Sequence, residues 1–149
     1  MLYFLSAFDA ASYLLFRGVE MKIAVASHDS TVIQDHFGHA RQFLIYECSA
    51  DRCELVEIRK QEPLCGSAGV DDEEGHSEDR LQQTIEQLSD CRAVVAARIG
   101  PPIVARLSRE GIHAFVIPGF IDDALRRLLA SGQLNAPVDP ARESFQWIR

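Results

Sequence analysis

The sequence has no excess of basic residues. Its 15 lysines and arginines are outnumbered by 22 aspartates and glutamates, so the formal net charge is -7 and the isoelectric point lies near 5.2. A protein that follows nucleic-acid phosphates normally carries a basic face, so we expect no nucleic-acid partner, although a local basic patch is compatible with this balance. The sequence also lacks an apolar run of membrane-spanning length, because Ser6, Asp9 and Ser12 interrupt the apolar N-terminal residues. We therefore expect no membrane partner.

Cysteine is scarce and widely spaced. The four residues, Cys48, Cys53, Cys65 and Cys91, form no CxxC pair. This pattern argues against a disulfide scaffold and favours a reducing, cytoplasmic setting. Cys48 and Cys53 flank a predicted four-residue turn and could face one another. We nevertheless expect them to be reduced, small apolar residues, because free cysteine is commonly buried.

The length fits a single domain with an adequate core, since 47% of the 149 residues are apolar and 25% are charged. We place an α/β domain at residues 21–134, because Met21 and Lys22 lead directly into a strand-like run. Residues 1–20 form an N-terminal extension that is either helical or not native to the protein. Residues 135–149 form a C-terminal tail.

Short apolar runs bounded by turn residues predict five strands, over residues 23–26, 42–48, 53–60, 93–97 and 113–117. Three helices should follow the third, fourth and fifth strands, the first capped by Ser77 and the second starting at Pro101. The first three strands suit an antiparallel meander, and right-handed crossovers add the last two strands parallel to the first. We therefore expect a mixed five-stranded sheet in the order 3-2-1-4-5, with helices on both faces.

The loop after the first strand carries a candidate binding site. His36 and His39 flank Gly38, where a ligand could approach the backbone without meeting a side chain. In the predicted sheet the first and fourth strands end at the same edge, so this loop should meet Arg98 and Gly100. We expect the helix that starts at Gly100 to offer unpaired amides to an anion, and Arg98 to add positive charge.

A second set of candidate ligands lies in a polar segment, residues 62–78. It has three glycines, an acidic run and almost no apolar residues, so we expect a mobile loop. The segment holds Cys65 and His76, two residue types that bind metals. Their spacing matches no standard zinc pattern, which leaves open whether they are ligands or residues without a role.

These motifs, in this order, resemble the dinitrogenase iron-molybdenum cofactor biosynthesis domain, which occurs in NifX-like and NifY-like proteins and at the C-terminus of NifB. The matching residues span roughly 21–132: Ser27-His28-Asp29, His36-Phe37-Gly38-His39-Ala40, Phe43-Leu44-Ile45-Tyr46, Asp90-Cys91, Arg98-Ile99-Gly100 and Gly111-Ile112. The resemblance implies a ribonuclease H-like fold of three layers (α/β/α). It also implies a non-catalytic domain that transiently carries an iron-sulfur or iron-molybdenum-cofactor-type cluster, with His36 as candidate ligand and with cluster donor and acceptor proteins as partners.

Other interpretations stay open. A ribonuclease H-like nuclease would need carboxylates that start within the first strand and converge on two metal ions, and residues 23–26 contain none. A regulatory or interaction domain would use the same crevice for a small anion or a partner protein. His36 could instead bond the backbone, Arg98 could pair with a carboxylate, and Cys91 is expected in the core. The apolar extension leaves a homodimer open.

Overall fold

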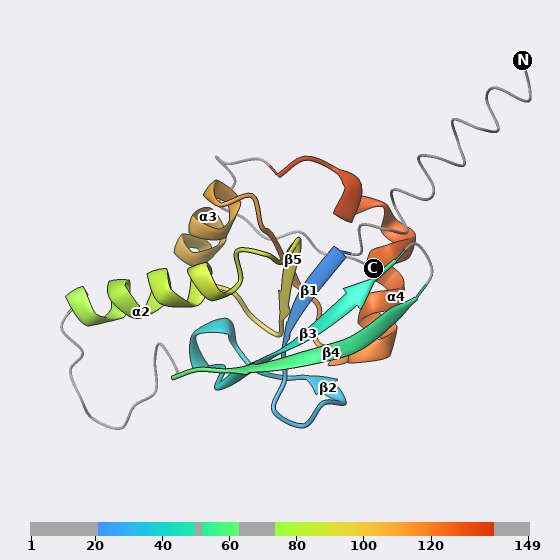
Figure 1. The fold of residues 1–149 in the computed structure, drawn as a ribbon, viewed down its shortest axis with the longest axis horizontal. Helices are drawn as coiled ribbons and strands as arrows, with labels where there is room; N and C mark the ends of the chain where they lie inside the picture. Colours follow the sequence, from blue (N-terminus) through green and yellow to red (C-terminus); the bar gives the residue numbers. More distant parts are fainter. Residues whose placement is uncertain (1–20, 50–51, 63–73, 139–149) are drawn as a thin grey trace, which may run out of the picture.

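The computed structural model describes residues 21–49, 52–62 and 74–138, without the side chains of residues 74–77. A five-stranded sheet in the order β4-β3-β1-β5-β6 forms its centre (Figure 1). Its strands are β1 (Met21–Ala26), β3 (Gln42–Cys48), β4 (Cys53–Lys60), β5 (Ala93–Ala96) and β6 (His113–Val116). β3 is antiparallel to both β1 and β4, whereas β5 and β6 run parallel to β1. The expected mixed sheet, its meander and its strand order are therefore observed.

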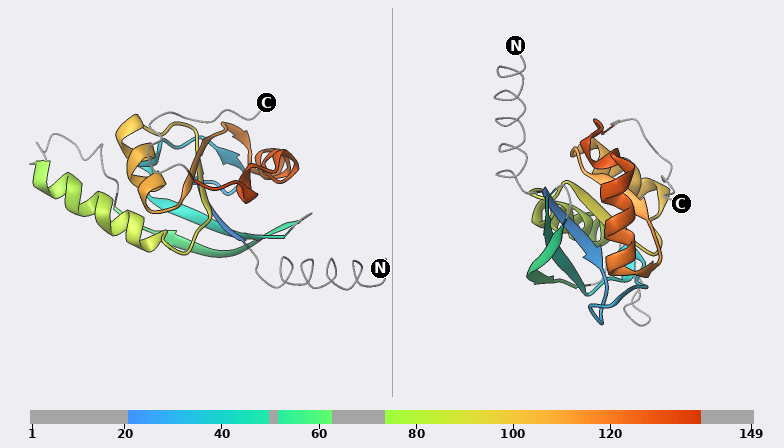
Figure 2. Two further views of the ribbon diagram at one scale, coloured as in Figure 1. Left: turned by 90° about the horizontal axis from the view of Figure 1, so that it is seen from above. Right: turned by 90° about the vertical axis from the view of Figure 1, so that its right-hand side faces the viewer.

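Helices cover both faces of the sheet, which explains why the central strands are apolar throughout. α2 (Glu74–Gln87) and α3 (Pro101–Arg109) contribute Leu81, Ile85, Val104 and Leu107 to the core on one face. α4 (Ile121–Ser131) covers the other face (Figure 2). It contributes Leu125 and Leu128 to the core there. The four residues of β5 are fully buried between these layers.

α2 begins earlier than the sequence predicts. The helix starts at Glu74, so Ser77 lies inside it and is not its N-terminal cap. Acidic residues are stabilised near a helix N-terminus by the backbone dipole, and Glu74 is the first residue of α2.

A second, two-stranded sheet was not expected. β2 (Val32–Ile33) pairs antiparallel with β7 (Gly119–Phe120), and Ile121 N donates to Thr31 O over 3.0 Å. This pairing fastens the loop after β1 to the loop that precedes α4. Two short 3-10 helices complete the fold, η1 (Phe37–His39) and η2 (Gln133–Asn135).

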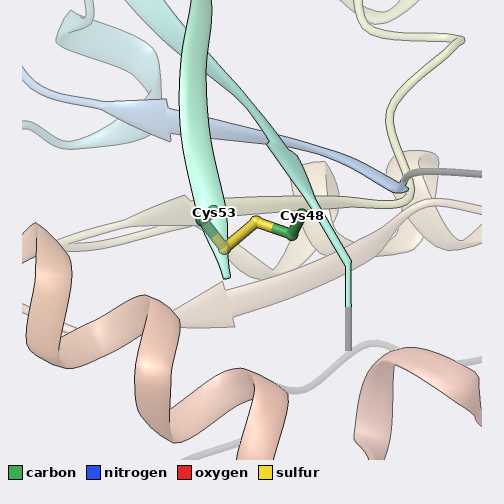
Figure 3. Close-up of a disulfide and its surroundings, with 2 residues drawn as sticks. All are labelled: Cys48 and Cys53. Carbon is green, nitrogen blue, oxygen red and sulfur yellow. A yellow bond between two sulfur atoms is a disulfide. The ribbon is translucent and has the colours of Figure 1, made fainter. Parts of the chain in front are cut away.

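The cysteine expectation was wrong. Cys48 and Cys53 form a disulfide with an S–S distance of 2.01 Å (Figure 3). The register of β3 and β4 places these two residues directly opposite each other. Residue spacing suggested this possibility, but only the register of the hairpin decides it.

Arg59 links the end of α2 to the edge strand β4. Its guanidinium donates to both carboxylate oxygens of Asp90 over 2.8 Å, to Glu57 over 3.0 Å, and to the carbonyl oxygen of Gln87. Lys22 adds a contact of 3.3 Å to Asp90. Hydrogen bonds from Arg59 hold the pKa of the Asp90 carboxyl well below its usual range, and the same contacts raise the pKa of Arg59.

The end of the described chain is held by side chains of the sheet. Arg92 donates to the carbonyl oxygens of Leu134 and Ala136, each over 2.7 Å, and the Nε2 atom of His113 lies 2.9 Å from the latter. In the part of the chain that the structure describes, no helix has the length and hydropathy needed to cross a bilayer.

Candidate functional site

The loop after β1 and the loop after β5 meet, as the sheet order predicts. Phe37 N donates to Arg98 O over 2.9 Å, and Ala97 N donates to Asp35 O over 2.9 Å. His36 and Arg98 form an isolated parallel β-bridge. Two segments that are far apart in the sequence are thereby held side by side at the carboxyl end of the sheet, where α/β folds commonly bind ligands.

The start of the first loop is fixed by its own polar residues. The Asp29 carboxylate accepts hydrogen bonds from Thr31 N over 2.8 Å and from Val32 N over 3.0 Å. These backbone donors lower the pKa of Asp29. These hydrogen bonds fix the backbone conformation at the start of the loop, ahead of His36 and His39.

His28 is engaged within the same loop. Its Nδ1 atom lies 2.9 Å from Asp35 Oδ1, and its Nε2 atom lies 2.7 Å from Gln34 Nε2. The hydrogen bond with Asp35 raises the pKa of His28. Our sequence reasoning did not select Asp35, whose carbonyl oxygen also accepts from Ala97 N. The only sign of a role for Asp35 in the sequence was that it is a polar residue in the same turn-prone loop as His28.

His36 and His39 are exposed and lie side by side. Their rings are nearly parallel, with an interplanar angle of 13° and centroids 5.4 Å apart. Phe37, which follows His36 in the sequence, is fully buried and contacts Phe43. The turn that carries the two histidines is therefore anchored in the core. Neither imidazole has a hydrogen bond or an ion pair with any residue that the structure describes. Both rings can therefore offer nitrogen lone pairs to a ligand.

Arg98 and Gly38 complete this part of the site in different ways. The Arg98 side chain is exposed and forms no ion pair with a described residue, so the alternative that it serves a carboxylate of the domain is not observed. Gly38 is buried within η1. The space beside Gly38 is therefore filled by other atoms of the protein, and Gly38 has little surface for direct contact with a ligand.

The expectation of free amides at the start of α3 was wrong. Pro101 and Pro102 occupy the first two helical positions and carry no N–H group. The next two amides, of Ile103 and Val104, both donate to Gly100 O over 3.0 Å. Gly100 itself has a φ of -65°, which any residue can adopt. An anion at this edge would consequently rely on side chains rather than on a helix N-terminus.

The candidate ligands of the polar segment are not placed. Cys65 lies outside the described residues, and His76 belongs to α2 without a described side chain. The first turns of α2 can nevertheless be located relative to α3, because Glu78 of α2 lines the same surface hollow as Pro101 and Pro102. The start of α2 therefore lies beside the start of α3, which follows Arg98 in the chain.

Cys91 belongs to the core, as expected. It is 4% exposed, and burial raises the pKa of its thiol to about 12. A thiol in this state is a poor metal ligand, because the thiolate is the form that binds. Across the described residues, no group of three or more histidine, cysteine, aspartate or glutamate side chains is arranged to hold a metal ion. The described residues thus offer two imidazoles rather than a complete ligand set.

Comparison with known proteins gives a consistent result. The family model for "Dinitrogenase iron-molybdenum cofactor" matches residues 19–131. The chain is 38% identical over 106 residues to "FeMo cofactor biosynthesis protein NifB" of Frankia alni, where the match covers 71% of this chain and 20% of that protein. It is 36% identical to "Protein NifX" of Rhodobacter capsulatus, covering 62% of this chain and 57% of that protein. It is also 32% identical to "Protein NifX" of Sinorhizobium fredii, covering 74% of this chain and 69% of that protein.

The chain therefore spans about a fifth of the NifB protein and between half and three quarters of these NifX proteins. Among solved structures, the crystal structure of PH0822 superposes with a TM-score of 0.55 at 19% identity. That match covers 74% of this chain and 90% of PH0822. It supports the fold.

Proposed function

Because the chain belongs to the dinitrogenase iron-molybdenum cofactor family, we propose that it is a non-catalytic carrier that transiently binds an iron-sulfur cluster or a related iron-molybdenum-cofactor precursor. The relatives named for cofactor biosynthesis support this class of cargo. In this proposal the partners are the proteins that donate and accept the cluster, in a cytoplasmic setting. We also propose that the three layers of the domain have a ribonuclease H-like arrangement.

One observation carries the proposal. His36 and His39 present parallel, exposed imidazoles 5.4 Å apart that have no competing partner in the described part of the domain. Arg98 lies beside His36 through a backbone bridge. Imidazole nitrogen is an established ligand of iron in iron-sulfur clusters, and a nearby cation favours an anionic cargo.

The chemistry suits a carrier more than a permanent holder. A cluster has several metal atoms, so two neighbouring imidazoles can bind it without saturating it. His36 is the proposed primary ligand, with His39 as the second. Arg98 and Gly100 border the cluster, and Gly38 shapes the turn between the histidines. A ligand set this small leaves open positions on the cargo at which an acceptor protein can attack.

Cys65 and His76 are proposed as additional donors. Thiolate is a preferred ligand of iron-sulfur clusters, and the start of α2 lies beside the start of α3. These donors would add to the two imidazoles in the ligand set of the cluster. Their contribution is separable from that of His36, because it can be tested by substitution of Cys65 alone.

The test is an anaerobic titration of the purified protein with a reconstituted iron-sulfur cluster, followed by iron and sulfide analysis and visible absorption. We expect stoichiometric binding by the wild-type protein and at least a tenfold loss of affinity in His36→Ala, about 1.4 kcal/mol or more. His28→Ala is the matched control, since His28 is exposed in the same loop but engaged by Asp35. It should bind like the wild type.

Two results would contradict the proposal. One is an absence of cluster binding by well-folded wild-type protein, which would favour an interaction or anion-binding domain. The other is an equal loss in His36→Ala and His28→Ala, which would show that the loop, and not the imidazole, matters.

A further inference from the structure

The face of the sheet that carries α4 is incompletely covered. On this face the described residues provide one α-helix, α4, and the short 3-10 helix η2, whereas the opposite face has both α2 and α3. Leu55 and Ile58 of the edge strand β4 are 41% and 47% exposed. Large apolar side chains in such a row normally mark a surface that contacts something.

A β-bulge directs both of these side chains toward α4. Leu55 pairs with Tyr46 and Ile58 pairs with Leu44, with a register shift beside Tyr46. Leu44 and Tyr46 are two residues apart and both belong to the core beneath α4. Opposed residues on neighbouring strands point to the same face, so Leu55 and Ile58 share the face of α4 although they are three residues apart.

This apolar row borders a cavity, because Tyr46, which pairs with Leu55, is one of the residues that line it. A hollow of about 350 Å³ lies between α4 and the end of the β3–β4 hairpin, lined by Tyr46, Cys53, Leu125 and Leu129. Three charged residues, Arg52, Asp122 and Arg126, also line it. We name the combined surface the α4–β4 trough, defined by Leu55, Ile58 and the four lining residues above. Its lining thus combines apolar and charged side chains.

The chain before Met21 joins the domain at one end of the trough. Met21 is paired with Cys48, whose disulfide partner Cys53 lines the cavity. Met21 and Cys53 also pack against the same core cluster. A segment that leaves the domain at Met21 therefore starts where the trough begins.

The preceding residues have the length and chemistry to fill it. Residues 1–20 include Phe4, Leu5, Phe8, Leu15 and Phe16, with few charged positions between them. Twenty residues extend about 30 Å as a helix, and the eight residues of β4 extend about 27 Å as a strand. The family model begins at residue 19, so this segment adds to the part of the chain that the family defines.

From these observations we propose that residues 1–20 dock in the α4–β4 trough of their own chain, placing phenylalanine and leucine side chains on Leu55 and Ile58. The segment completes the second helical layer of the domain. It leaves the carboxyl edge of the sheet, where His36 and His39 lie, open to ligands. The inference does not depend on the cargo.

The experiment is a double-mutant cycle in the full-length chain. One variant changes the segment (Phe4→Ser with Phe8→Ser), a second changes the trough (Leu55→Ser with Ile58→Ser), and a third combines them. If the two surfaces contact each other, each of the first two variants lowers the melting temperature by roughly 3 to 6 °C. The combined variant then falls no further than the larger single effect, because the contact is already lost.

Phe120→Ser provides the control for an exposed apolar residue. Phe120 is 66% exposed and does not line the cavity, so its effect should add to that of the segment variant. Nuclear Overhauser contacts between the Ile58 methyl groups and phenylalanine rings of residues 1–20 give a direct readout of the docked state.

Three results would overturn the proposal. The first is additivity between the segment and trough variants. The second is an unchanged melting temperature in the segment variant, with no ring-to-methyl contacts. The third is a dimer in light scattering that dissociates in the trough variant, which would show that a second copy covers the surface. Circular dichroism of each variant verifies that it is folded, and the exposed positions of Leu55 and Ile58 favour that outcome.

Discussion

Arg59 and Arg98 show two uses of the same side chain. Arg59 is 16% exposed at its side chain and donates to Asp90, Glu57 and the end of α2. Arg98 is exposed and forms no ion pair with a described residue, beside two imidazoles that are equally unengaged. Arg59, which holds two elements together, uses its hydrogen-bond donors within the chain. The donors of Arg98, at the carboxyl edge of the sheet, remain available to a molecule from outside.

Removing Asp90, the carboxylate partner of Arg59, should have the largest effect on stability. Asp90→Ala leaves a mostly buried guanidinium without its main partner, and we expect a loss of about 1–3 kcal/mol in the free energy of unfolding, with the lower half favoured because Asp90 is 44% exposed. Urea denaturation measures this loss. Asp79→Ala is the control, since Asp79 is an exposed aspartate on α2, the helix that precedes Asp90, and forms no ion pair with a described residue. Equal losses in both variants would contradict a specific role for Asp90.

Removing the second arginine should affect binding and leave stability unchanged. In Arg98→Gln we expect cluster affinity to fall by about three- to fivefold at low salt, and the difference to shrink as added salt screens the charge. The free energy of unfolding should stay within about 0.5 kcal/mol of the wild type. Arg109→Gln, at an exposed position on α3, should change neither quantity. A loss of stability in Arg98→Gln would mean that this arginine holds the fold, as Arg59 does.

Acid titration should give the smallest difference. The pKa of Asp90 is lower in the folded than in the unfolded protein, so the unfolded state binds the proton more readily. The stabilisation by this carboxylate is therefore complete above roughly pH 4, the ordinary aspartate value, and declines as the pH falls further. We expect stability to fall less steeply below that pH in Asp90→Ala than in the wild type, by under about 1 kcal/mol given solvent screening. Parallel curves would show that other carboxyls dominate.

The sequence was sufficient for the sheet and for the meeting of the loops after β1 and β5 at one edge of it. Runs such as residues 93–96 are apolar throughout because helices cover both faces of the sheet, and a continuous apolar run is a local signal. Parallel crossovers then require the loops after β1 and β5 to share an edge, which brought His36 and Arg98 together in the prediction. The blocked amides of α3 could also have been predicted, since Pro101 and Pro102 have no N–H to offer.

Other features depend on contacts that no local pattern encodes. The pairing of β2 with β7 joins two-residue segments far apart in the chain. Arg92 binds the carbonyl oxygens near Leu134, which follows from where the chain ends up and not from its own neighbours. The parallel stacking of His36 on His39 is set by η1, a turn too short to leave a periodic signal.

The two prolines at the start of α3 have a consequence for how a bound cluster would leave. A backbone cradle grips an anion through many donors at once, and an acceptor would have to displace them together. Side-chain donors such as His36 and His39 can be exchanged one at a time for the acceptor's own ligands. Hand-over would then proceed by successive ligand substitution, in which the cargo is never free in solution.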